Sequence, residues 1–97
     1  MAKYVTLYSF TDQGVRAIKD TPGRARGAIE AAQKAGMKVH GLYYTQGPYD
    51  VVVVSEADDD KMAAAFALAT ASQGNVKSIT MRAWDVDEFE EIVGLMP

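Results

Sequence analysis

The chain has 97 residues, 48% of them hydrophobic, and a formal net charge of -3, which is typical of one globular domain. The acidic balance excludes the strongly basic surface of a nucleic-acid-binding protein, and the absence of cysteine excludes disulfides and thiolate metal sites. No apolar run approaches the ~18 residues of a membrane span, and no signal-peptide block opens the chain. We therefore expect a cytoplasmic protein with no nucleic-acid or membrane partner.

The first part of the chain predicts one strand and one long helix. Residues 3–10 are rich in aromatic and β-branched types, as strands are, and residues 11–20 predict a loop with a helical turn. Residues 21–36 predict a helix that Thr21 caps and Gly36 ends. The apolar spacing of this helix places on its buried face Ala25, Ala28, Ile29, Ala32 and Ala35.

A hairpin follows, in which residues 38–45 and 49–56 are the strands. The second strand contains four consecutive valines, residues 51–54, where a half-exposed strand would alternate apolar and polar types. A continuous apolar run is expected when both faces of a strand are buried. The sequence therefore predicts that each face of the sheet is covered.

The last part of the chain predicts a helix, a strand and a short terminal helix. Residues 58–74 are rich in alanine and begin with aspartates, which suit the positive end of a helix dipole. Residues 76–84 predict a strand. Asp85 and Glu88 have the spacing of a helix-capping pair and predict a terminal helix over residues 85–93.

The resulting order, β-α-β-β-α-β with a tail helix, predicts an α+β protein of the ferredoxin-like class. We expect residues 1–97 to form one domain, with a four-stranded antiparallel sheet and both long helices on one face. Alternation along the strands then suggests a set of side chains for the helix side, namely Val5, Leu7, Ile79, Met81 and Ala83. It leaves for the open side Tyr4, Thr6, Tyr8, Phe10, Ser78, Thr80, Arg82 and Trp84.

An open face of this kind is rarely left in water, because large contiguous apolar patches on monomers mark binding surfaces. We expect a second subunit to cover it, so the protein would be a homo-oligomer that assembles through the open sheet face. Two sheets packed in this way lie ~10 Å apart.

Four segments together resemble the GYD domain family: FTDQGVRAIKDTP, GLYYTQGPYDVVVVSEADDD, FALATASQGNVKSITMRAW and the closing EFEEIV. The resemblance covers about residues 3–95. In the name motif, Pro48 stands between Gly47 and Tyr49, and its fixed backbone angle stiffens the turn. The resemblance implies a ferredoxin-like fold similar to the dimeric α/β-barrel group, in which two sheets face each other, and it implies no particular reaction.

The residue types on the open face suggest a ligand site. Arg82 would bind an anionic or enolate-like group, because a guanidinium under a second sheet needs an anion or an aromatic face. The alternative is an ion pair between subunits, with Asp50 or Glu56 as the partner. Asp50 is also a candidate general base, or else a turn residue that accepts backbone N–H bonds.

His40 is the only histidine and cannot form a metal site of ordinary ligand count alone, so no metal or cofactor is predicted. Four basic residues flank the start of the first long helix and are interpreted as a solvated patch: Arg16, Lys19, Arg24 and Arg26. The alternative is a phosphate or nucleotide site at the helix start, but this segment lacks a glycine-rich phosphate motif.

Three functions remain open on this sequence. The first is a homo-oligomer that binds a small ligand, with an anion as one option, between subunit sheets. Its candidate site comprises Tyr8, Thr45, Tyr49, Asp50, Arg82 and Trp84. The second is a small cofactor-independent oxygenase or isomerase of the dimeric α/β-barrel kind. The third is a purely structural oligomer.

Overall fold

The computed structural model describes all 97 residues. Its elements are β1 (Ala2–Phe10), α1 (Asp12–Arg16), the 3₁₀ turn η1 (Ile18–Asp20), α2 (Thr21–Lys34), β2 (Lys38–Tyr44), β3 (Val51–Ala57), α3 (Asp60–Ser72), β4 (Val76–Ala83) and α4 (Val86–Gly94). Their order is the predicted one, and the strands and long helices begin and end within two residues of the predicted positions. None of the helices combines the length and the apolar character needed to cross a bilayer.

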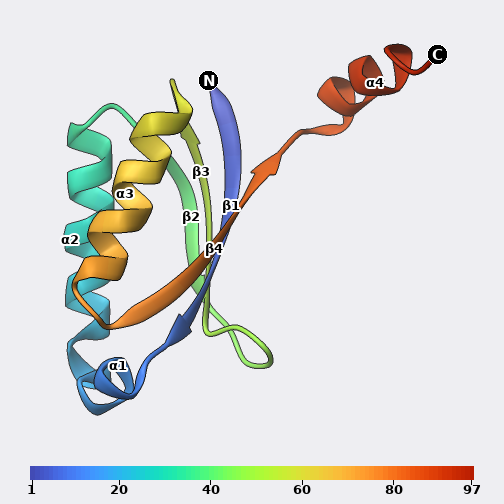
Figure 1. Cartoon of the computed structure of the whole chain (residues 1–97). Coiled ribbons are helices and arrows are strands. Elements are labelled where there is room, and N and C mark those ends of the chain that lie inside the picture. Colours follow the sequence, from blue (N-terminus) through green and yellow to red (C-terminus); the bar gives the residue numbers. More distant parts are fainter.

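The four strands form one antiparallel sheet in the order β2-β3-β1-β4. Helix α2 connects the parallel strands β1 and β2 across β3, and α3 connects β3 and β4 across β1. Because such crossovers are almost always right-handed, both helices are brought to the same face. Figure 1 shows α2 and α3 on one side of the sheet and the other side uncovered. The predicted ferredoxin-like fold is confirmed.

The helix ends follow local hydrogen bonding, with one departure from prediction. Asp85 accepts a bond from the Glu88 backbone, and the Glu88 side chain returns one to Asp85, so the predicted capping pair is confirmed. Gly36 has a φ of 91°, which suits the predicted helix end. Thr21 does not cap α2, however. The turn η1 runs directly into α2, so Thr21 is already helical and its hydroxyl accepts a bond from Arg24.

The two faces of the sheet are the reverse of those that alternation suggests. The side chains that point toward α2 and α3 are those of Tyr4, Thr6, Tyr8, Phe10, Val51, Val53, Ser55 and Thr80. The assignment of Val5 and Leu7 to the helix side is therefore wrong. Two of the four valines do lie on each face, as predicted.

Side-chain size explains which face the helices cover. The surfaces that α2 and α3 turn toward the sheet are mostly alanine, such as Ala32 and Ala63, and these short side chains cannot reach the strands alone. Long aromatic side chains can span the distance. Tyr4 is 6% exposed and forms the small core with Ala32, Met37 and Ala57. Helices rich in alanine thus require the aromatic face of β1.

The uncovered face is aliphatic. Strand pairing places Leu7 between Val52 and Ile79, and in the next row it places Val5 between Val54 and Met81. Residues directly opposite each other in neighbouring strands share a face, so these six side chains form one continuous surface. The centre of this face is apolar, as predicted, but these six central side chains are aliphatic.

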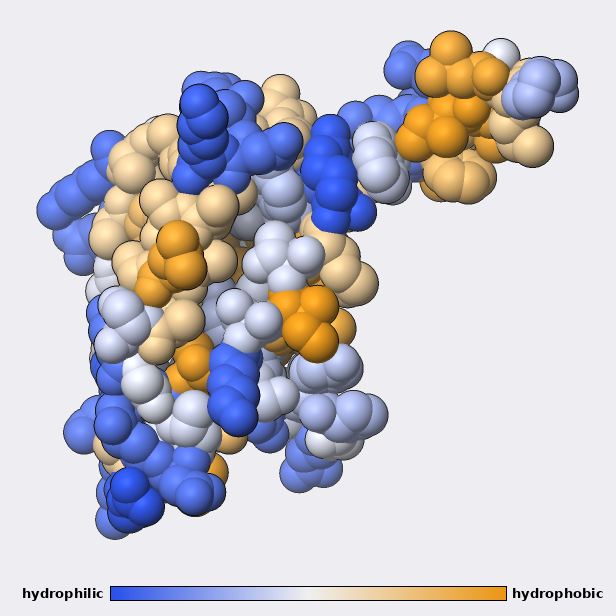
Figure 2. Space-filling view, in the orientation of Figure 1, coloured by the Kyte–Doolittle hydropathy of each residue, from blue (hydrophilic) through white to orange (hydrophobic).

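Helix α4 lies outside this two-layer body. It extends beyond the end of β4, away from α2 and α3, and gives the molecule a longest dimension of 51 Å (Figure 1). Apolar side chains gather on it in Figure 2, and Phe89 and Leu95 are 56% and 84% exposed. Its start is tied to the sheet by Lys3, whose Nζ donates to Glu88 Oε1 over 2.9 Å. We call α4 and residues 95–97 the arm.

Candidate functional site

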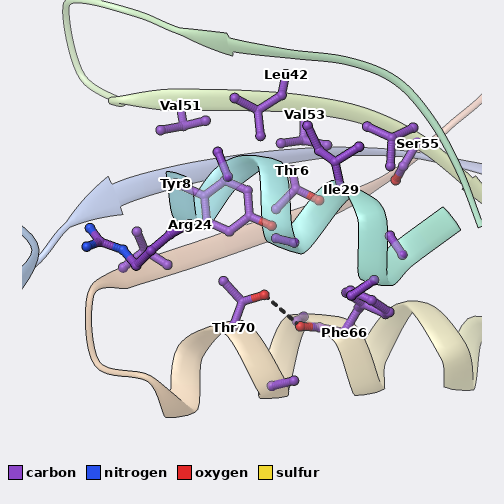
Figure 3. A pocket seen from close by; sticks show the side chains of 18 of the residues that line it. Thr6, Tyr8, Arg24, Ile29, Leu42, Val51, Val53, Ser55, Phe66 and Thr70 are labelled. Atoms are coloured by element: carbon purple, nitrogen blue, oxygen red, sulfur yellow. Dashed lines mark hydrogen bonds between the residues drawn. The ribbon is translucent and has the colours of Figure 1, made fainter. Parts of the chain in front are cut away.

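A cavity of about 530 Å³ lies between the inner face of the sheet and the helices α2 and α3. Of the 28 residues that line it, 19 are hydrophobic. Figure 3 shows Tyr8 extending from β1 toward the space between the two helices, with Phe66 and Thr70 on α3. This volume falls within the range of small-molecule binding sites.

The cavity exists because the helices carry small side chains where cores usually have large ones. Its walls include Ala28 and Ala31 on α2, and Ala63 and Ala67 on α3. The backbones of the two helices approach the strands and η1 more closely than they approach each other, which leaves room for a cavity between them and the sheet. A close-packed interior rarely leaves a void larger than a water molecule.

Hydroxyl groups line the cavity on the sheet side and on α3. Thr6 and Thr80 face each other across β1 and β4 with their Oγ1 atoms 3.3 Å apart. The hydroxyl of Thr70 donates to the Phe66 carbonyl within α3 over 2.9 Å. The Tyr8 hydroxyl makes no hydrogen bond within the chain, and burial raises the pKa of this phenol. Tyr8 therefore stays protonated at neutral pH and can donate a hydrogen bond to a bound molecule.

The two ends of the cavity differ. The end near the start of β1 is closed by the core around Tyr4 and Met37. The other end has polar residues beside apolar ones, and we call it the polar end. Its polar members are Arg24, Tyr44, Gln73 and Asn75. Arg24 is the only charged residue in the lining; its guanidinium donates to the Ala17 carbonyl and the Thr21 hydroxyl over 3.3 Å and 2.8 Å.

The six residues predicted as one site lie in three places. Tyr8 lines the cavity. Thr45, Tyr49 and Asp50 form the connection between β2 and β3, where the Thr45 hydroxyl donates to the Tyr49 carbonyl over 2.6 Å. The Asp50 carboxylate accepts a bond from the Phe10 backbone N–H over 2.8 Å, and the Asp50 N–H donates to the Tyr8 carbonyl. Asp50 thus joins this connection to β1 and does not line the cavity.

Arg82 and Trp84 lie at the opposite end of the sheet from Asp50. Arg82 pairs with Tyr4 whereas Tyr8 pairs with Ser78, so Arg82 and Tyr8 are separated by about 13 Å along the strands. The Arg82 guanidinium is 5.0 Å from the centre of the Trp84 ring and 5.8 Å from that of Tyr4. Such distances suit cation–π contacts.

His40 bonds to Glu56, and this bond lowers the pKa of the Glu56 carboxyl. No three His, Asp or Glu side chains gather anywhere in the chain as they would around a metal ion. Both residues point to the uncovered face of the sheet, and neither lines the cavity.

Sequence reasoning missed the sheet wall of the cavity and the place of Arg24. One signal was available in the sequence: hydroxyl residues alternate through apolar strands, opposite helices whose inward positions are alanine. That combination leaves space beside polar groups. Arg24 was interpreted with its basic neighbours as part of a solvated patch, whereas it lies at the polar end of the cavity.

Comparison with known proteins adds a family and one relative. The family model for the GYD domain matches residues 4–93. The chain is 33% identical over 90 residues to a Thermus thermophilus protein named "Glutamine synthetase and cystathionine beta-lyase binding protein", and the match covers 92% of this chain and 95% of the relative. No solved structure gives a significant match.

Proposed function

This chain belongs to the GYD domain family, and we propose that it is a homo-oligomeric binding protein that takes a small molecule into the cavity between its sheet and helices. The observation that carries the proposal is the cavity itself. It is large, mostly apolar and closed at one end, and it offers the unpaired Tyr8 hydroxyl. We propose a cytoplasmic location for this binding protein, as expected from the sequence.

The ligand site in this proposal differs from the one expected between subunit sheets. The aromatic and hydroxyl side chains of β1 lie on the helix side, where they line the cavity of a single chain. The uncovered face has only aliphatic residues at its centre and offers a ligand few polar groups. Ligand binding and assembly would therefore use opposite faces of one sheet.

The uncovered face supports assembly with a second copy of this chain. Its centre is a continuous apolar surface, and two copies of such a face can pack on each other. The arm supports the same assembly, because its exposed apolar residues extend away from the helices.

The binding of a partner enzyme is a second candidate function. The Thermus thermophilus relative is named as a protein that binds glutamine synthetase and cystathionine beta-lyase. We propose that this chain likewise binds an enzyme, and that the cavity ligand changes the affinity. Titration of purified glutamine synthetase from the same host, with and without small-molecule extract, tests this by light scattering. An unchanged mass at saturating concentration contradicts it for that enzyme.

An acid–base enzyme has less support from the cavity. Its lining contains no Asp, Glu, His or Lys, and Tyr8 holds its proton because burial raises its pKa. A phenol in that state suits hydrogen-bond donation better than proton abstraction.

Native mass spectrometry of protein purified from its own host is the direct experiment. The proposal expects an oligomer that carries one small molecule per chain. The variant Ala67→Leu, which projects a larger side chain into the cavity and obstructs it, should give the same oligomer without the added mass. A monomer contradicts the assembly, and an added mass that persists in Ala67→Leu contradicts the site.

A further inference from the structure

We propose that the cavity selects a molecule with an apolar body and one anionic group, and that Arg24 binds the anion at the polar end of the cavity, which we call the mouth. This inference rests on the proposed function, because it requires that the cavity is a ligand site. It adds the chemical class of the ligand and the residue that distinguishes it from a neutral molecule of the same shape.

The charge distribution of the lining is the first argument. Arg24 is the only ionised side chain among the residues around the cavity, so an anion is favoured at one end and nowhere else. A cationic ligand would find no carboxylate there. The walls toward Met37 and Phe66 are apolar and suit a hydrocarbon or aromatic body.

The unused bonding capacity of Arg24 is the second argument. The guanidinium has five N–H donors, and the chain supplies partners for two of them, the Ala17 carbonyl and the Thr21 hydroxyl. No carboxylate lies within ion-pair distance of it, although Lys3 and Lys34 each have such a partner. A half-buried guanidinium with free donors beside an apolar cavity is suited to a carboxylate or a sulfonate from outside the chain.

The position of Arg24 is the third argument. Thr21 and Arg24 are in the first turn of α2, while Gln73 and Asn75 lie just beyond the end of α3. Together they contribute the polar groups at this end of the cavity. In Figure 3 the Arg24 side chain lies at the margin of the lining side chains and points away from their centre. The anionic group would therefore remain near water at the mouth, and only the apolar body would be fully desolvated. A charge bound in this way avoids the cost of deep burial.

Arg26 provides a matched control. It belongs to the same helix turn and has the same charge, but it is exposed and does not line the cavity. General attraction between an anion and the basic start of α2 should weaken equally in Arg24→Gln and Arg26→Gln. Binding at the mouth should weaken only in Arg24→Gln.

The experiment compares two fluorescent probes of nearly equal shape, the anionic anilinonaphthalene sulfonate and the neutral phenylnaphthylamine. We expect wild type to bind both, and the variant Ala67→Leu to lose the cavity signal for both. Arg24→Gln should lower the affinity for the anionic probe about tenfold, as expected for the loss of a charge-assisted bond. It should change the affinity for the neutral probe by less than about twofold. Arg26→Gln should change neither.

The outcomes separate the two levels of the proposal. If wild type binds neither probe, or if Ala67→Leu leaves the binding of both probes unchanged, the cavity is not a ligand site and the proposed function fails. If both probes bind there and Arg24→Gln affects them equally, the cavity stands and the assignment of Arg24 is overturned.

If Arg24→Gln does not fold, a measurement on the wild-type protein still tests the inference. Phenylbutyrate and phenylbutanol differ only in their end group and can each displace the neutral probe. The inference expects phenylbutyrate to compete several-fold better at low salt, with the advantage reduced at high salt because the pair at the mouth is screened. Equal competition overturns it.

Discussion

The two faces of the sheet are both apolar, but they are built for different uses. The inner face carries long aromatic and hydroxyl side chains that meet alanine-rich helices across an incompletely filled space. The outer face carries flat rows of aliphatic residues and no covering element. Apolar character alone therefore does not distinguish a surface that holds a ligand from one suited to another subunit. The distinction depends on side-chain length and on what lies opposite.

Aspartate at two adjacent positions of β3 should separate the faces most sharply. Val53 points toward the helices, and Val52 lies on the uncovered face. Val53→Asp places an unpaired charge in the interior and should lower the free energy of unfolding by about 3 kcal/mol or more. Val52→Asp should leave the monomer folded and abolish assembly. Urea denaturation and analytical ultracentrifugation measure both, and an oligomer in Val52→Asp would contradict the comparison.

Two tyrosines give a smaller version of the same contrast. The hydroxyl of Tyr4 bonds to Asp60 on α3, whereas Tyr43 is 62% exposed on the outer face. Tyr4→Phe should cost about 1–3 kcal/mol, because a bond to a charged group is lost. Tyr43→Phe should change stability by less than about 0.5 kcal/mol. Thermal denaturation of both variants checks this. An equal loss of stability in the two variants would mean that the bond from Tyr4 does not anchor α3 to the sheet.

A larger side chain in the cavity should raise the free energy of unfolding, whereas the preceding substitutions lower it. Ala67→Leu adds apolar volume where the inner face leaves space, and we expect a gain of about 1 kcal/mol with a loss of probe binding. Leu68→Ala next to it changes a side chain that is 71% exposed and should affect neither. A clear loss of stability in Ala67→Leu would mean that the space is already occupied by close packing.

The smallest expected effect is the loss, at low pH, of the Lys3–Glu88 pair that holds the arm to the sheet. The hydrogen bond from Lys3 lowers the pKa of Glu88 below its ordinary value of 4.5. The folded chain thus binds this proton less readily than the unfolded chain. The contribution of the pair is present above pH 4.5 and is lost as the pH falls through the folded pKa.

The fluorescence of Trp84, the only tryptophan, reports on this anchor because Trp84 lies between the end of β4 and the start of the arm. Its emission should shift as the pH falls below about 4.5. The variant Glu88→Gln should show the shifted emission already at neutral pH. The same acid transition in both proteins would assign the change to another group.

Local pattern predicts most of the architecture of this chain. The elements, the capping pair at Asp85 and Glu88, and the division of the valines between two faces all depend on neighbours in sequence. These features need only the helix and strand periods and the chemistry of helix ends.

Alternation could not decide which face the helices cover, because both faces of β1 are largely apolar. The choice depends on what stands opposite, namely the alanines of α2 and α3, and this is a long-range property. The candidate site failed for the same reason. Tyr8, Asp50 and Arg82 were grouped by an assumed common face, but strand register places Arg82 at the far end of the sheet and the backbone of β1 engages Asp50.

The contact between Gly14 and Asn75 gives the cavity mouth one rigid side. A Cβ atom at Gly14 would lie 2.1 Å from the Asn75 carbonyl oxygen, so only glycine permits this approach. Thr11 donates to the backbone oxygens of Gly74 and Asn75 and closes the same junction. The substitution Gly14→Ala should therefore displace Asn75, which lines the cavity, and change the rate at which a ligand enters and leaves. Residence time would then be a property of this junction.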